Sequence, residues 1–330
     1  MKKKVLLIHT GGTIGMVRDT ESGVLKPDRF YDSLLKVIPE LDQLAEIQVE
    51  IPFLFDSSDM DLGHWETLGR VIADHIPGVD GVVITHGTDT LAYTASALSY
   101  MLENLPVPVI LTGAQKPLSD LRSDARSNLI NAVEMAASGV REVAVVFDDK
   151  LLRGNRTTKV HTSHFDAFHS PNFPPLAEIG INIEIAWSQV RTPQGPFRFH
   201  PEMEGSIAVL KLFPGIRPQY FQPPRECRGI ILIGYGAGTV PMKYGEIVHK
   251  AEEWINQGRV VVLMSETKAG PTDPRLYESG SHLLEIGVLP TWDMTFEAAV
   301  TKLIHLMGCH CDNPSVRHDF LQPIAGEMTL

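Results

Sequence analysis

The chain has 330 residues, of which 43% are hydrophobic and 21% are charged, and its formal net charge is -11. These values are typical of a soluble globular protein that is long enough for two domains. The negative charge argues against a nucleic-acid partner, because binding to a phosphate backbone calls for a basic surface.

The sequence predicts neither an export signal nor a membrane span. Lys2, Lys3 and Lys4 precede only a short apolar run that ends at His9, well short of the hydrophobic region of a signal peptide. No other apolar run reaches transmembrane length. We therefore expect a cytoplasmic protein with no membrane partner.

Three cysteines, Cys227, Cys309 and Cys311, are too few and too unevenly placed for a disulfide framework, which fits a reducing compartment. His305 with Cys309 and Cys311 is a conceivable metal site, with His310 or His318 as a fourth ligand. Structural zinc usually takes a second spaced pair of ligands, which is missing. We therefore favour the interpretation that these are small residues and a histidine near the end of a helix, and we expect no bound metal.

The first half of the chain alternates between strands and helices. Apolar runs predict strands at 3–9, 47–55, 81–85, 109–111 and 143–147. Helical patterns lie between them at 27–38, 64–75, 91–102 and 123–138. This alternation predicts an α/β fold with a mostly parallel sheet that helices cover on both faces.

The second half predicts a smaller α/β domain behind a linker. Residues 151–173 have no clear period, and four Pro or Gly residues between 193 and 201 mark a linker. Strands follow at 207–212, 230–233 and 260–264, and helices at 244–256 and 296–307. We assign a larger N-terminal catalytic domain to 1–190, a linker to 191–211 and the C-terminal domain to 212–330.

A glycine-rich loop follows the first strand, with the sequence Thr10-Gly11-Gly12-Thr13-Ile14-Gly15. Glycine lets the backbone approach a ligand closely, and the Thr13 hydroxyl becomes a nucleophile if a neighbouring group removes its proton. The loop lacks the Gly-x-Gly-x-x-Gly and Gly-Lys-Ser/Thr patterns of nucleotide sites. The alternatives are a turn without chemistry and a phosphate loop.

Three further groups of polar residues occur along the chain. Two follow predicted strands, at 56–60 and 86–90, and the third is at 153–159. Open α/β sheets bind ligands beyond the ends of their strands. Thr88 offers a second hydroxyl and Asp89 a carboxylate, while the amine of Lys159, if burial makes it neutral, can draw a proton from a hydroxyl. Each has a simpler interpretation. Thr88 and Asp89 resemble a helix N-cap before 91–102, and Lys159 resembles a solvated surface lysine.

Four segments together resemble the bacterial-type L-asparaginases, most closely their cytoplasmic type I branch. They are Thr10-Gly11-Gly12-Thr13-Ile14-Gly15, Asp56-Ser57-Ser58-Asp59-Met60, His86-Gly87-Thr88-Asp89-Thr90 and Arg153-Gly154-Asn155-Arg156-Thr157-Thr158-Lys159. The resemblance extends over nearly the whole chain, including the segment 293–298.

The resemblance implies hydrolysis of L-asparagine to L-aspartate and ammonia without metal or cofactor. Thr13 would form a β-aspartyl ester, and Thr88, Asp89 and Lys159 would form a second catalytic group. Asp89 and the Ser57-Ser58 turn would hold the α-ammonium and α-carboxylate. The remaining substrate-binding residues would be Gly12, Asp56, Gly87 and Ala114. The family is a homodimer or homotetramer, and some type I members are allosteric through a regulatory asparagine site.

Two positions depart from the family pattern. Many members activate the first threonine with a loop tyrosine, whereas this chain has Val24 at the matching place and Tyr31 further on. An asparagine that many members contribute from a neighbouring subunit is replaced within 236–239. The sequence therefore leaves the group that deprotonates Thr13 unassigned.

Two other functions compete with asparaginase. One is the asparaginase-like subunit of an archaeal tRNA-dependent amidotransferase, which hydrolyses glutamine; such subunits carry an extra N-terminal domain, whereas Thr13 lies near the start of this chain. The other is a regulatory protein that binds an amino acid without turnover.

Overall fold

The computed structural model describes residues 2–18, 25–27, 37–242 and 246–329. The chain forms two compact units, residues 1–201 and 202–330. The boundary lies within 191–211, the predicted linker, and the last residues of that range already form a strand of the second unit. Most of the helix predicted at 27–38, together with Val24 and Tyr31, lies outside the described residues.

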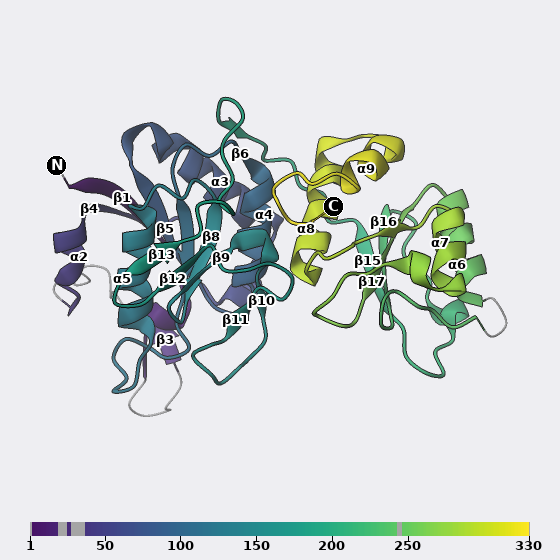
Figure 1. The fold of residues 1–330 in the computed structure, drawn as a ribbon, viewed down its shortest axis with the longest axis horizontal. Helices are drawn as coiled ribbons and strands as arrows, with labels where there is room; N and C mark the ends of the chain where they lie inside the picture. Colours follow the sequence, from purple (N-terminus) through teal and green to yellow (C-terminus); the bar gives the residue numbers. More distant parts are fainter. Residues whose placement is uncertain (1, 19–24, 28–36, 243–245, 330) are drawn as a thin grey trace. The chain divides into compact units, whose positions relative to one another are not determined.

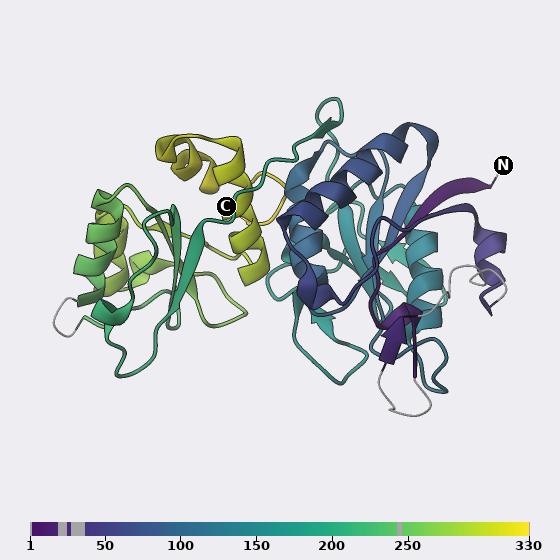
Figure 2. The same ribbon diagram turned by 180° about the vertical axis from the view of Figure 1, so that it is seen from behind.

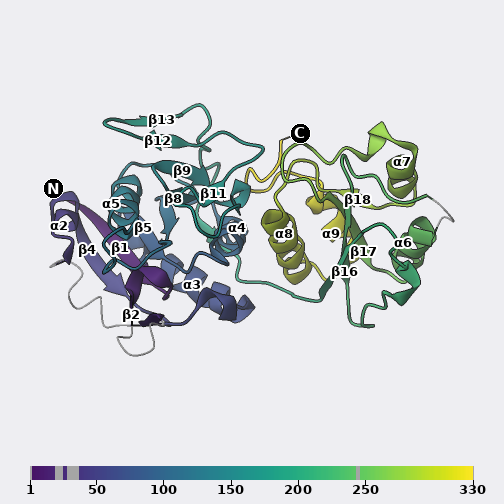
Figure 3. The same ribbon diagram turned by 90° about the horizontal axis from the view of Figure 1, so that it is seen from below.

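The first unit is organised around an eight-stranded sheet in the order β13-β12-β9-β8-β7-β5-β1-β4 (Figure 3). Five neighbouring strands are parallel: β4 (Ala45–Glu50), β1 (Lys3–His9), β5 (Gly81–Thr85), β7 (Val109–Thr112) and β8 (Val143–Phe147). The central strands β5, β7 and β8 are buried along their whole length. Continuous apolar runs of this kind are what a parallel sheet with two covered faces requires, so this part of the prediction is confirmed.

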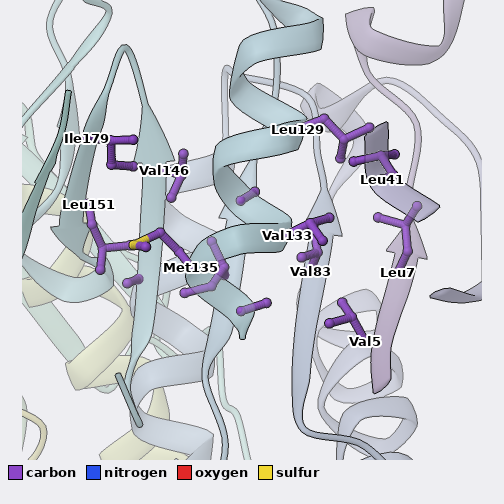
Figure 4. Packing of buried hydrophobic residues seen from close by; sticks show 14 of the residues in the cluster. Val5, Leu7, Leu41, Val83, Leu129, Val133, Met135, Val146, Leu151 and Ile179 are labelled. Atoms are coloured by element: carbon purple, nitrogen blue, oxygen red, sulfur yellow. The ribbon is translucent and has the colours of Figure 1, made fainter. Parts of the chain in front are cut away.

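Helices cover both faces of this sheet (Figures 1 and 2). On one face, α2 (Glu40–Leu44) and α5 (Ala125–Ala136) pack on Val5, Val83 and Val146 of the strands. Figure 4 shows Leu129, Val133 and Met135 of α5 facing this apolar layer. On the other face lie α3 (Leu62–His75) and α4 (Leu91–Met101).

The strand order reverses at β1. The chain places β4 on one side of β1 and then returns to place β5 on the other side. Such a reversal is where open α/β sheets bind ligands, at the carboxyl ends of the strands. The loops that follow β1, β5 and β7 are therefore the first candidates for a site.

Residues 148–185 add antiparallel strands that the sequence pattern did not predict. They are β9 (Lys150–Arg153), β12 (Ala177–Ile179) and β13 (Ile183–Ile185), which extend the sheet, and the hairpin of β10 (Thr158–Lys159) and β11 (Phe168–His169). Asp148 and Asp149 have positive φ angles and allow β9 to turn back tightly on β8. Strands this short are below the length at which periodicity is readable.

Two small two-stranded pairs complete the first unit: β2 (Met16–Arg18) with β3 (Leu25–Pro27), and β6 (Leu102–Glu103) with β14 (Arg198–Phe199).

The second unit is a four-stranded parallel sheet in the order β15-β16-β17-β18. Its strands are β15 (Ile207–Lys211), β16 (Gly229–Gly234), β17 (Val260–Ser265) and β18 (Leu289–Pro290). Helices α6 (Glu246–Asn256) and α7 (Glu278–Glu285) pack on one face, and α8 (Phe296–Cys309) and α9 (Asn313–Phe320) on the other. The sequence predicted all of these elements except β18, α7 and α9. Among the described residues, no helix is long and apolar enough to span a membrane.

Candidate active site

The loops after β1 and β5 meet through glycines. Gly11 and Gly12 have φ angles of 110° and 81°, which side-chain-bearing residues rarely adopt. A Cβ atom on Gly12 would lie 2.5 Å from the backbone N of Gly87, and one on Gly87 would lie 2.5 Å from Oγ of Ser57. Three segments far apart in the sequence thus meet here, Gly12 against the Gly87 backbone and Gly87 against the Ser57 side chain, and a side chain on either glycine would clash.

Hydrogen bonds fix these segments at the carboxyl ends of the strands. Thr10 N–H donates to the Thr85 carbonyl (3.1 Å), and Phe55 N–H donates to the Thr10 carbonyl (3.3 Å). The Thr90 hydroxyl donates to the Ser57 carbonyl (2.7 Å). The segment 55–58 therefore lies beside both the first glycine loop and the start of α4.

Thr13 and Ser57 each begin a single turn of 3-10 helix, Thr13–Gly15 and Ser57–Asp59. Asp56 caps the second turn, since its Oδ1 accepts the Ser58 N–H at 2.9 Å. The N–H and hydroxyl of Ser58 hold the pKa of the Asp56 carboxyl below its usual value. Asp56 is thus an anion whose carboxylate stabilises the turn. Thr13 is half-buried and follows Gly12 directly.

Thr88, Asp89 and Lys159 form one hydrogen-bonded group. Lys159 Nζ donates to Thr88 Oγ1 at 2.8 Å and to Asp89 Oδ1 at 2.7 Å. The Lys159 side chain is 17% exposed and that of Asp89 67%. Lys159 is therefore not a solvated surface lysine, and Asp89 presents a largely open carboxylate.

The interpretation of Thr88 and Asp89 as a helix cap is wrong. The N-cap of α4 is Thr90, and no side chain caps this helix. The Thr90 hydroxyl instead donates to the Ser57 carbonyl, and the Asp89 carboxylate accepts from Lys159. The two polar residues before α4 are thus turned toward other segments rather than toward the helix.

The antiparallel hairpin brings Lys159 to this group. Lys159 lies opposite Phe168, whose ring is buried and packs 4.8 Å from the ring of Phe147 at the end of β8. The preceding turn is held by Arg153, which donates to the buried Glu142 carboxylate from Nε (2.7 Å) and Nη2 (3.1 Å). The basic segment 153–159 is therefore mostly buried structure that ends in one side chain facing Thr88.

Sequence reasoning missed Gln115, which follows Ala114 in the turn after β7. Thr88 Oγ1 donates to Gln115 Oε1 at 3.4 Å, and Gln115 Nε2 donates to the His164 carbonyl at 3.0 Å. The backbone N–H of Gln115 donates to both carboxylate oxygens of the buried Asp124. The available signal was its position alone, since Gln115 is a polar residue in the turn after a buried strand.

Burial keeps two histidines beneath these loops neutral. Burial lowers the pKa of His9 to about 3 and that of His86 to about 4. His9 Nδ1 lies 2.7 Å from Thr85 Oγ1. Neither ring is placed to carry charge at neutral pH.

The candidate metal ligands His305, Cys309 and Cys311 lie at and just after the end of α8. There the Cys309 sulfur lies 3.6 Å from His305 Nε2. Within the described ranges, no group of three or more His, Cys, Asp or Glu side chains is arranged to hold a metal ion.

The predicted residues are distributed as follows. Gly12 and Gly87 approach each other through their backbones, and Gly87 approaches the Ser57 side chain. Thr88, Asp89 and Lys159 are hydrogen-bonded. Asp56 and Ser58 flank Ser57 in sequence, Thr13 follows Gly12, and Ala114 precedes Gln115. A hydroxyl with a bound amine, an open carboxylate and glycine-bordered backbone suits an amino-acid ligand and acyl transfer to a hydroxyl.

Comparison with known proteins identifies the family. The family model "Asparaginase, N-terminal" matches residues 4–191, and "Glutaminase/Asparaginase C-terminal domain" matches 206–320. The chain is 39% identical to L-asparaginase 1 of Escherichia coli strain K12, over 99% of this chain and 98% of that protein. The crystallised thermostable L-asparaginase of Thermococcus kodakarensis is 36% identical with a TM-score of 0.92, over 99% of both chains.

L-asparaginase I of Vibrio cholerae O1 is also similar in structure, at 38% identity and a TM-score of 0.90 over 100% of both chains. These matches cover both units and agree with the two-domain α/β architecture described above. The chain therefore belongs to the asparaginase family.

Proposed function

We propose that this protein is an L-asparaginase, which hydrolyses the side-chain amide of L-asparagine to give L-aspartate and ammonia. The observation that carries the proposal is the group Thr88–Asp89–Lys159, in which one amine contacts both a hydroxyl and an open carboxylate at 2.7 to 2.8 Å. Thr88 and Asp89 of this group lie on the loop after β5, in which Gly87 contacts Gly12, the residue directly before Thr13.

In this mechanism Thr13 Oγ1 attacks the amide carbon of the substrate. The C–N bond then breaks, the nitrogen leaves as ammonia after gaining a proton, and the acyl group remains on Thr13 as a β-aspartyl ester. Water cleaves the ester in a second step. The proton that Thr13 loses and the proton that the leaving nitrogen gains pass through Thr88 and Lys159, whose heavy atoms lie 2.8 Å apart.

Substrate binding rests on the charges of a free amino acid. The exposed carboxylate of Asp89 would bind the α-ammonium group, and the turn at Ser57 and Ser58 would bind the α-carboxylate. Gly12, Asp56, Gly87 and Ala114 would line the pocket. Fixing the α-carbon in this way lets the chain length decide where the amide lies, which favours asparagine over glutamine.

Two neighbouring functions are less well supported. The 39% identity to L-asparaginase 1 of Escherichia coli over 99% of this chain supports asparagine hydrolysis over the amidotransferase function. The Lys159 contacts with Thr88 and Asp89 favour catalysis over mere binding, since a carboxylate alone would hold an ammonium group.

Assembly, regulation and location remain proposals that rest on the family resemblance. We propose a homodimer or homotetramer, a regulatory response to asparagine, and a cytoplasmic location like that implied by the type I resemblance and the similarity to L-asparaginase 1. Sedimentation velocity and the shape of the rate curve against asparagine concentration test the first two.

The proposal is tested by measuring ammonia release from L-asparagine and L-glutamine by the purified protein. One methylene group in a fitted pocket changes discrimination by about 10- to 200-fold, so kcat/KM should favour asparagine by about this factor. Equal kcat/KM for the two amides would contradict the substrate assignment. Absence of ammonia release from both would leave a binding protein.

A further inference from the structure

A buried chain of hydrogen bonds ends at the peptide that precedes Thr88. Trp65 Nε1 on α3 donates to Thr94 Oγ1 on α4 at 2.9 Å. Thr94 Oγ1 lies 3.0 Å from His86 Nε2, and His86 Nδ1 lies 2.8 Å from the Gly87 carbonyl oxygen. His86 and Thr94 are fully buried, and Trp65 is 7% exposed.

The direction of every bond in this chain follows from its two ends. Indole Nε1 can only donate, so Thr94 Oγ1 accepts from Trp65 and its own hydrogen is free to go to His86. The Gly87 carbonyl can only accept, so His86 Nδ1 must carry a proton. Both ends therefore require the same neutral tautomer of His86, protonated on Nδ1 and accepting at Nε2.

This tautomer fixes the plane of the peptide between Gly87 and Thr88. The Gly87 carbonyl is held toward the buried imidazole, and the N–H of Thr88 belongs to the same planar trans peptide and points the opposite way. Among the described residues no acceptor takes the Thr88 N–H. The donor therefore stays available on the residue whose hydroxyl binds Lys159.

We propose that His86, held as the Nδ1–H tautomer by Thr94 and Trp65, is a positioning residue that orients the Gly87–Thr88 peptide for the amide hydrolysis proposed above. It contacts neither substrate nor reacting atoms. The role depends on the proposed function, since a backbone N–H aimed at developing negative charge contributes to acyl transfer only if that reaction occurs. The competing explanation is that His86 is an ordinary core residue, whose hydrogen bonds satisfy its buried nitrogens and have no effect on catalysis.

The test uses Thr94→Val, which keeps the shape of the side chain but removes the hydroxyl that serves His86. We expect kcat for asparagine to fall by about 10-fold, a small fraction of what losing an oxyanion donor outright costs, with KM within about twofold because the groups proposed to hold the zwitterion are untouched. Thr94→Ser restores the hydroxyl and should recover most of kcat.

Thr301→Val is the matched control. Thr301 is also fully buried on a helix, but its hydroxyl donates to its own helix at the Glu297 carbonyl (2.7 Å) in the second unit. If Thr94→Val and Thr301→Val lower the melting temperature alike but only Thr94→Val lowers kcat, the positioning role is supported. Full kcat in a folded Thr94→Val protein overturns it.

The tautomer is measured independently of these variants. Two-bond 1H–15N correlation spectra of the parent protein labelled on histidine nitrogens should place the His86 proton on Nδ1 at neutral pH. A proton on Nε2 would overturn the proposal even if Thr94→Val failed to fold. A parent that releases no ammonia would refute the proposed function together with this role, whereas an active parent with an active Thr94→Val refutes this role alone.

Discussion

Two lysine–carboxylate pairs, one in each unit, show how the surroundings of an ion pair separate chemistry from stability. In the first unit Lys159 contacts Asp89, whose side chain is 67% exposed, and Thr88. In the second unit Lys302 and Glu327 form a pair at 2.5 Å whose side chains are completely buried.

The buried pair has its polar atoms satisfied by backbone. Lys302 Nζ donates to the Phe320 carbonyl (2.9 Å), and the two oxygens of Glu327 accept the N–H groups of Ile324 (3.0 Å) and Ala325 (2.8 Å). These contacts hold residues 320–327 against α8, and the buried charges are not accessible to a ligand. The Lys159 pair keeps an exposed carboxylate and a neighbouring hydroxyl, which is what a reactive site needs.

The largest effects are expected when each lysine is removed in turn. Lys159→Met should lower kcat by about 1,000-fold or more, because general acid–base help alone contributes about 100- to 10,000-fold, and should change stability little. Lys302→Met should keep kcat but lower the free energy of unfolding by about 3 to 5 kcal/mol, since it leaves an unpaired buried carboxylate.

The double variant Lys302→Met with Glu327→Leu sharpens this contrast. Replacing both charges with apolar groups should recover most of the lost stability. Denaturant titrations and steady-state kinetics on the four proteins measure both effects. The comparison fails if Lys302→Met loses activity as Lys159→Met does while remaining folded.

The two carboxylates should differ as the two lysines do: Asp89 should serve substrate binding and Glu327 stability. Asp89→Asn should raise KM for asparagine by about 10- to 100-fold, because a charge-assisted bond to the α-ammonium contributes about 1.5 to 3 kcal/mol. Glu327→Gln should leave KM unchanged and lower the melting temperature. A normal KM in Asp89→Asn would show that another group binds the ammonium.

Acid should weaken the first unit through His86. Its pKa is lowered by burial from 6.5 to about 4, so the unfolded chain binds the proton more readily than the folded one. Stability from this group is therefore full above pH 6.5 and is lost as pH falls toward 4. Between pH 7 and pH 5 we expect a loss of about 2 kcal/mol from His86 alone.

Urea titrations monitored between pH 7.5 and pH 4.5 measure this loss. An unfolding free energy that stays constant or rises over this range would contradict the neutral buried histidine.

The smallest effect concerns Gln115. Gln115→Met keeps the length of the side chain but removes its bonds to Thr88 and to the His164 carbonyl, so kcat should fall by about 10-fold, the equivalent of about one hydrogen bond. Gln222→Met is the control, because Gln222 is exposed and donates only to the nearby Gln219 carbonyl. Equal kcat in both variants would remove Gln115 from the site.

The sequence predicted the regular part of the fold because the central strands, such as β5 and β8, are buried on both faces and read as unbroken apolar runs. The same reasoning placed Thr13 and Thr88 after strands, and the meeting of their two loops at Gly12 and Gly87 follows from the parallel order of β1 and β5. The antiparallel strands from β9 to β13 were not predicted. Strands of two to four residues form through tertiary pairing and have no readable local pattern.

The supporting residues of the site could not be found from the sequence for the same reason. His86 acts with Trp65 on another helix, and Gln115 acts with His164 across the hairpin. The sequence shows His86 and Gln115 only as polar residues after buried strands and does not show their partners. Only the fold brings their partners within hydrogen-bonding distance.

The central claim, that Thr13 is the nucleophile, is tested most directly by trapping the acyl intermediate. Rapid mixing with L-asparagine, acid quench and peptide mass analysis should find an aspartyl group on the peptide that contains Thr13, most clearly in Lys159→Met, where water attack on the ester is slowed. Thr13→Ala in the same background should carry none. An aspartyl group on the peptide that contains Thr88, or undiminished ammonia release by Thr13→Ala, would contradict the claim.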